Sequence, residues 1–259
     1  MAEHTGREHD LPKQIEALQN ELMQLKTNNQ VIWDLLVQIG NKLQRSSTSI
    51  KTAVSSLLDY DIFWDETTQY EFLQAIDSST NELANLIVLM TLAFRSQAKT
   101  LEIETEPNLL QEILVTLQNS IDKNNHRVEV EVHFPAEGKP ALVDYHYLTL
   151  ALELLIGVIF SEDKDTTKLS VIARKNVDCW YLQIEHLNPS LTDIIRHFFE
   201  QANDIVTIAN QILPENALKL MTACRILYLQ NIKLDKETVS NPTTIYLHIP
   251  MATKNSKDE

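Results

Sequence analysis

The chain has 259 residues, of which 44% are hydrophobic and 22% are charged, so it can bury the core of more than one folded unit. Its net charge of −14 argues against nucleic acid and anionic lipid as partners, because both would repel it. The apolar runs at 83–94 and 148–160 are too short to span a bilayer, and residues 1–10 are polar, so we expect a cytoplasmic protein without membrane contact.

The number and spacing of glycine, cysteine and histidine residues argue against phosphate-binding loops and metal sites. There are only four glycines, and none follows Gly157, although loops that cradle phosphate depend on glycine. Cys179 and Cys224 lack the spacing of a metal site, and no two of the eight histidines have metal-ligand spacing on one expected helix. We therefore expect no metal and no cofactor.

A seven-residue rhythm of apolar side chains runs through the first part of the sequence. It predicts a polar N-terminus and coiled coil over residues 1–40 and continues into the next segment. An asparagine within the stripe favours a two-stranded register, so the sequence predicts a parallel homodimer. The alternative is that the stripe packs against a second helix of the same chain. The predicted interface positions are Ile15, Leu18, Leu22, Leu25, Asn29, Ile32, Leu36, Ile39, Leu43 and Ile50.

Residues 41–107 are expected to form a helical hairpin. Aromatic and acidic residues at 59–66 indicate a loop, and the apolar spacing of 68–99 is typical of a second amphipathic helix. Two such hairpins, one from each chain, would make a dimeric four-helix bundle.

Residues 108–254 have a mixed pattern. We expect helices at 109–121, 144–161 and 214–229, with one or two more within 192–213. Strands are expected around 128–132, 169–172, 180–184 and 244–249. Helices on one face of a mixed sheet predict a two-layer α/β sandwich, which makes the whole chain α+β and leaves 255–259 as a tail.

This order of elements resembles the transmitter region of sensor histidine kinases, a dimerisation and phosphotransfer hairpin followed by an ATP-binding domain. The resemblance covers about residues 40–251 and is one of pattern. In the hairpin it rests on Leu43, Thr48, Ser49, Ile50, Lys51 and Leu57, and on residues 92–106 and 108–114. In the sandwich it rests on Asp144, Tyr147, Leu148, residues 152–155, 217–227 and 243–250.

At the positions that carry chemistry in that family, this sequence departs from the pattern. The resemblance puts Asn41 at the place of the phosphoacceptor histidine and Lys42 at the place of the acid that follows it. An amide cannot take a phosphoryl group as an imidazole nitrogen can. The two asparagines that hold Mg²⁺ and phosphates correspond to Glu153 and Gly157, and a carboxylate there would repel the phosphates.

The nucleotide-binding turns also differ from the family pattern. The Asp-x-Gly-x-Gly turn that reads adenine should follow the strand at 180–184, where this chain has Glu185 and, four residues later, Pro189. In that family a mobile loop, the lid, closes over ATP, and its last glycines correspond to Ala217 and Lys219. Between 190 and 213 the chain is rich in isoleucine and phenylalanine, so we expect a buried helix there, packed into or across the former nucleotide cleft.

These observations predict a non-catalytic, dimeric pseudokinase that acts as a scaffold or regulatory binding protein in signal transduction. The resemblance implies a response regulator, a histidine kinase or another signalling protein as partner. Two alternatives stay open. One is a phosphotransfer protein or residual histidine kinase, although no histidine lies between His9 and His126. The other is a purely structural subunit of a larger assembly.

Overall fold

The structure is a computed structural model that describes residues 5–58, 64–124, 129–135, 139–164, 166–200, 211–235 and 240–252. Its helices are α1 (Thr5–Leu57), α2 (Glu66–Gln97), α3 (Leu110–Asn124), α4 (Tyr145–Glu162), α5 (Pro189–Glu200) and α7 (Pro214–Leu229). Its strands are β1 (Glu106–Asn108), β2 (Glu129–His133), β3 (Ala141–Val143), β4 (Lys168–Lys175), β5 (Cys179–Glu185), β6 (Lys233–Leu234) and β7 (Ile245–Pro250).

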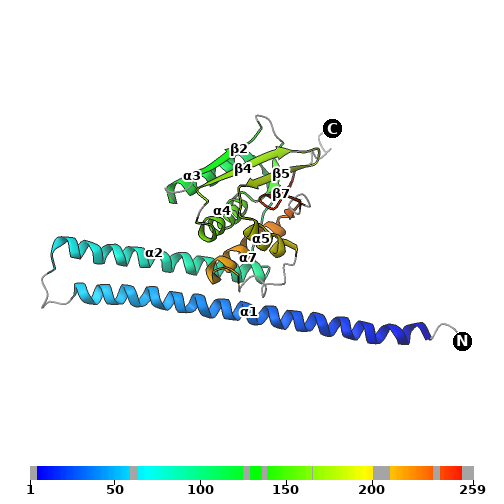
Figure 1. Ribbon diagram of the computed structural model, residues 1–259, viewed down its shortest axis with the longest axis horizontal. Helices are drawn as coiled ribbons and strands as arrows, with labels where there is room; N and C mark the ends of the chain where they lie inside the picture. The colour runs from blue at the N-terminus through cyan, green and yellow to red at the C-terminus, as the bar shows by residue number, and fades with distance from the viewer. Residues whose placement is uncertain are drawn as a thin grey trace.

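Helices α1 and α2 form the predicted hairpin. They run side by side, and the N-terminal part of α1 continues well beyond the end of α2 (Figure 1). The start of α2 is fixed by Asp65, whose side chain accepts a hydrogen bond of 2.6 Å from the Thr68 amide. The expected boundary at residue 40 lies inside α1, which continues through it without a break.

The second part of the chain is a five-stranded sheet with helices packed on one face. The strand order is β2-β4-β5-β7-β6, in which only the β2–β4 pair is parallel. A separate two-stranded sheet joins β1 to β3. Residues of alternate strand positions, such as Val171, Leu182 and Leu247, are fully buried in one core with α3, α4 and α7. This is the two-layer sandwich that the sequence predicts (Figure 1).

Helix α4 is the centre of that core. Among the described helices it is long and apolar enough to cross a bilayer, yet Leu148, Leu152 and Leu155 are completely buried against the sheet and its neighbouring helices. Asp144 caps its first turn by accepting from the Tyr147 amide at 3.0 Å. The burial explains why this helix is apolar on nearly every side.

The hairpin and the sandwich share a single hydrophobic core. Leu35 and Ile39 of α1, together with Leu86 and Leu89 of α2, belong to the same buried cluster as the sandwich. Helix α7 carries this contact, since it packs against α4 on one side and against α2 and α1 on the other. The sandwich is therefore seated on the hairpin.

Most predicted elements are confirmed within a few residues, and three short strands were not predicted. Strands β1, β3 and β6 have only two or three residues each, too few to show an alternating pattern. Val128, placed at the start of a predicted strand, lies outside the described residues.

Candidate functional site

The face of α4 that carries Glu153 and Gly157 borders a cavity of about 320 Å³ between α3 and α4, here called the α3–α4 cavity. Apolar side chains form much of its wall, namely Ile121 of α3 with Ile156 and Phe160 of α4. Glu153 is partly buried, and among the described residues its carboxylate has no hydrogen-bond or ion-pair partner. The described residues also contain no group of three side chains that could hold a metal ion.

The N-terminus of α7 is closed by a carboxylate from the end of α4. Glu162 Oε1 accepts hydrogen bonds from the Leu213 amide at 3.0 Å and from Asn216 Nδ2 at 2.6 Å. The first turn of α7 also contains Pro214, which has no amide hydrogen, and the acidic Glu215. A helix N-terminus attracts anions, so the two carboxylates at this end of α7 are favourably placed there and add negative charge to it.

The acid at the end of β5, Glu185, lies on the face of the sheet that is turned away from the helices. Glu185 accepts a hydrogen bond from Gln183, two residues before it on the same face, whereas Leu182 and Ile184 point into the core beneath the helices. The acid that the sequence places near the adenine-reading position therefore lies away from the helices. His186 follows with φ of 68°, a conformation that glycine adopts more easily.

The segment expected to replace the mobile lid is helical over its first part. Helix α5 begins at Pro189, and its Leu191, Ile195 and Phe198 are buried. It packs against α7 and β6. The helix and its burial are thus confirmed for 189–200, while Ile205, Val206 and Ile208 lie outside the described residues.

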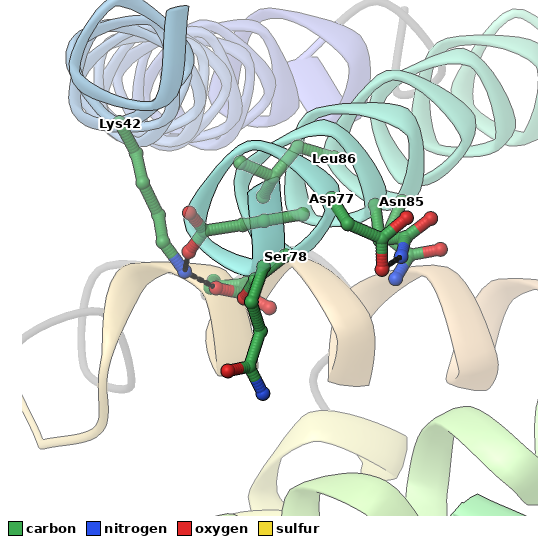
Figure 2. A pocket seen from close by; sticks show the side chains of 9 residues that line it. Lys42, Asp77, Ser78, Asn85 and Leu86 are labelled. Carbon is green, nitrogen blue, oxygen red and sulfur yellow. Dashed lines mark hydrogen bonds and ion pairs between the residues drawn. The ribbon is translucent and has the colours of Figure 1, made fainter. Parts of the chain in front are cut away.

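A network of charged side chains, here called the junction, joins the hairpin to the sandwich. Lys42 Nζ of α1 lies 3.0 Å from Glu82 Oε1 of α2 and is bonded to Glu215 of α7. Lys219 Nζ contacts the other oxygen of Glu215 at 2.6 Å, and Ser46 Oγ donates to Glu82 Oε2 at 2.6 Å. Figure 2 shows the Lys42 side chain reaching from α1 past α2 toward α7.

A cavity of about 500 Å³ lies beside the junction, between α2 and the start of α7. Its wall is mainly polar and includes Asp77, Ser78 and Asn85 of α2 (Figure 2). Asp77 accepts a hydrogen bond from Asn81 Nδ2 at 3.2 Å. The polar groups of this cavity therefore line the seam between hairpin and sandwich.

The contacts of the junction favour the charged forms of Glu215, Glu82 and Lys42, as the directions of their pKa shifts indicate. Burial acts to raise the pKa of Glu215, but hydrogen bonds from Lys219 and Lys42 outweigh it and leave that pKa below its usual value. The pKa of Glu82 is lowered by its hydrogen bonds with Ser46 and Lys42. Burial acts to lower the pKa of Lys42, and its two carboxylate partners raise it overall.

Asn41 lies exposed on α1, one residue before the lysine of the junction. The ion pair between Lys42 and Glu215 joins this part of α1 to the first turn of α7, the helix that also carries Ala217 and Lys219.

The predicted interface stripe divides into two parts. Ile15, Leu18 and Leu22 are about half exposed or more, at 49%, 63% and 55%, so they are free to meet a partner. Leu36 and Ile39 are buried by the same chain, as the within-chain alternative expects. Leu43 and Ile50 are partly buried, and the side chains of Leu25, Asn29 and Ile32 lie outside the described residues.

No protein-family model matches the sequence, and no curated protein is similar to it. Solved structures are similar in fold. The Acinetobacter baumannii histidine kinase AdeS has a TM-score of 0.53 at 13% identity, covering 82% of this chain and 98% of that chain. The full-length ShkA structure in complex with AMPPNP has a TM-score of 0.54 at 11% identity, covering 86% and 46%. Histidine kinase ThkA, in complex with response regulator protein TrrA, has a TM-score of 0.50 at 13% identity, covering 90% and 66%.

This chain has the fold of a histidine kinase transmitter region. Identities of 11–13% show the fold alone. In the histidine kinase fold of this chain, two features were not predicted from the sequence: the Glu162 contact with α7 and the pairing of Lys42 with Glu215. The second joins residues 173 positions apart, which no local pattern reveals.

Proposed function

We propose that this protein is a non-catalytic, dimeric pseudo-histidine kinase that acts as a scaffold or regulatory binding protein in cytoplasmic signal transduction. The observation that carries the proposal is the state of the α7 N-terminus. Glu162 and Glu215 supply two carboxylates where the family binds nucleotide, and Pro214 removes a backbone donor. These residues do not fit a triphosphate, because like charges repel and Pro214 has no amide hydrogen to donate.

The acceptor side supports the same proposal. Asn41 offers an amide where the family has its phosphoacceptor, and Lys42 next to it is engaged with Glu82 and Glu215 instead of acting as a base. Glu153 adds a third carboxylate at a position that the resemblance assigns to Mg²⁺ and phosphate binding. Donor and acceptor chemistry would thus both be lost.

Nucleotide binding and labelling test this proposal directly. The full chain is titrated with a fluorescent ATP analogue with and without Mg²⁺, and is incubated with radiolabelled ATP before acid-labile phosphate is measured. We expect no binding at micromolar concentrations and no label. An active histidine kinase serves as the positive control. Micromolar affinity for the nucleotide would overturn the proposal.

The variant Asn41→His distinguishes the loss of the phosphoacceptor from the loss of nucleotide binding. It restores an imidazole at an exposed position of α1, so the fold should tolerate it. We expect this variant to stay unlabelled with ATP, because a chain that does not bind ATP cannot phosphorylate the new histidine. Labelling of the variant by ATP would show that only the acceptor is missing. Acid-labile label on the unmodified chain after mixing with a phosphorylated regulator would favour a phosphotransfer function instead.

A response regulator is the partner that the proposal puts first. The support is the histidine kinase fold itself, together with the structure of ThkA in complex with the regulator TrrA. Calorimetry of the full chain with regulators from the same source would test this. The isolated chain should also be a soluble dimer in light scattering, whereas a subunit that serves only assembly would be unstable alone.

A further inference from the structure

The α3–α4 cavity combines an apolar wall with a single carboxylate. The residues of α4 that line it, from Glu153 through Ile156, Gly157 and Phe160 to Ser161, recur at helical spacing and form one strip. That strip is about 12 Å long at 1.5 Å per residue. Glu153 lies at one end and the hydroxyl of Ser161 at the other.

Glu153 is a partly buried carboxyl side chain without a partner among the described residues. Taking a carboxylate partly out of water costs free energy that an opposite charge recovers. The other acids near the α4 and α7 helices differ in this respect, since Glu162 and Glu215 have hydrogen-bond donors. The carboxylate in this cavity is therefore the one that a ligand could satisfy.

Gly157 provides the space for that ligand. A Cβ atom placed on Gly157 would meet nothing within 4 Å, so no close approach of backbone explains the glycine. Glycine in a helix is destabilising by about 1 kcal/mol relative to alanine. Here its effect is to leave the floor of the cavity open between Ile156 and Phe160.

We propose that the α3–α4 cavity binds a small organic cation, an ammonium or guanidinium group on an apolar body. The cation pairs with Glu153, and the body lies over Gly157 against Ile121, Ile156 and Phe160. A volume of about 320 Å³ is at the small end of ligand cavities, which run from about 300 to 1,000 Å³. The ligand is therefore smaller than a nucleotide and opposite to it in charge.

The test uses the full chain and three compounds of similar body, namely 2-phenylethylammonium, neutral 2-phenylethanol and anionic 3-phenylpropanoate. Binding is measured by calorimetry and by saturation-transfer NMR. We expect the cation to bind at least about tenfold more tightly than the alcohol, and the anion not to bind. The preference for the cation should weaken with added salt, since a partly exposed ion pair is screened.

Two variants locate the site. Glu153→Gln should remove the preference for the cation, whereas Glu112→Gln, an equal change of charge on the exposed side of α3, should not. Gly157→Leu should fill the cavity and abolish binding of all three compounds. Gly40→Leu is its control, because Gly40 also has open space around it and lies on α1. Thermal melts check that each variant is folded.

Equal affinities for the ammonium and the alcohol would overturn the proposal, as would binding that survives Gly157→Leu. Failure here would leave the non-catalytic role unaffected, because that role is argued from α7, from Asn41 and from the negative charge of Glu153, and not from a ligand in this cavity. Conversely, nucleotide binding that persists in Gly157→Leu would reject the non-catalytic role and leave the cation site standing.

Discussion

One ammonium group connects three helices that are far apart in the sequence. Lys42 of α1 pairs with Glu82 of α2 and with Glu215 of α7, and Lys219 completes a group of two cations and two anions. The side chain of Lys42 is 39% exposed and that of Glu215 is 25% exposed, so water screens the network only in part. Its energetic contribution should exceed that of an isolated surface pair.

The variant Lys42→Met should reduce the free energy of unfolding by about 1 kcal/mol, the upper range for a partly exposed pair. For a chain of this size that corresponds to a melting temperature lower by about 2–4 °C. Lys51→Met is the matched control, an exposed lysine on the same helix. Thermal unfolding followed by circular dichroism measures both, and equal effects of the two variants would contradict a role of the junction.

The contribution of Glu215 to the free energy of unfolding should depend on pH. The pKa of folded Glu215 is lowered, so its stabilising contribution is present above the unfolded value of about 4.3 and disappears as the pH falls through the folded value. We expect Glu215→Gln to be less stable than the natural chain by a constant amount between about pH 6 and 8.

The difference in free energy of unfolding between the natural chain and Glu215→Gln should disappear toward pH 3. Urea titrations at a series of pH values measure this difference. A stability difference that stayed the same down to pH 3 would show that the carboxylate charge is not what stabilises the junction.

At the scale of secondary structure, the bounds of α7 could be predicted from the sequence, but its contact with α4 could not. Its start and end, Pro214 and Leu229, follow from the proline and from the apolar spacing. The position of its N-terminus against Glu162 does not follow, because that contact joins two helices 51 residues apart. Periodicity fixes which face of a helix is buried, but it does not specify the neighbour.

Removal of the Glu162 side chain should destabilise the first turn of α7. Glu162→Ala loses hydrogen bonds to Leu213 and Asn216 and an anion at a helix N-terminus, so we expect a loss of about 1–2 kcal/mol. Hydrogen exchange should quicken at the start of α7 more than at its end. Glu71→Ala, an exposed change on α2, is the control. Uniform exchange along α7 in the variant would argue against this local effect.

The same contrast holds for the candidate site. The hairpin and the sandwich could be predicted, because they depend on local patterns and on the order of elements. The correspondence of Asn41 and Glu153 with the functional positions of histidine kinases stays a prediction. The placement of Glu185 on the open face of the sheet required the register between β4 and β5, which pairs Glu185 with Ser170. The burial of Leu35 and Ile39 in the core shared with the sandwich required the docking of the sandwich on the hairpin.

At the scale of the whole molecule, α1 carries apolar side chains beyond the rest of the fold. Leu18 and Leu22 are 63% and 55% exposed in the single chain, and the proposed homodimer would bury them. Leu18→Glu combined with Leu22→Glu should raise the dimer dissociation constant at least about 100-fold, since each charge opposes burial.

Sedimentation equilibrium measures that dissociation constant. Gln19→Glu combined with Asn20→Glu is the control, because both positions are exposed on the same stretch of α1. If the leucine variant and the control dimerise equally well, the stripe at the start of α1 is not the interface.

The continuity of α1 has a mechanical consequence. From Thr5 to Leu57 it is one helix, about 80 Å long at 1.5 Å per residue. A stiff rod transmits torque along its axis, so a partner that grips the far end and turns it would swing Lys42 away from Glu215 in the same motion. The sandwich would then be released from the hairpin by a twist applied at Thr5, 37 residues before Lys42.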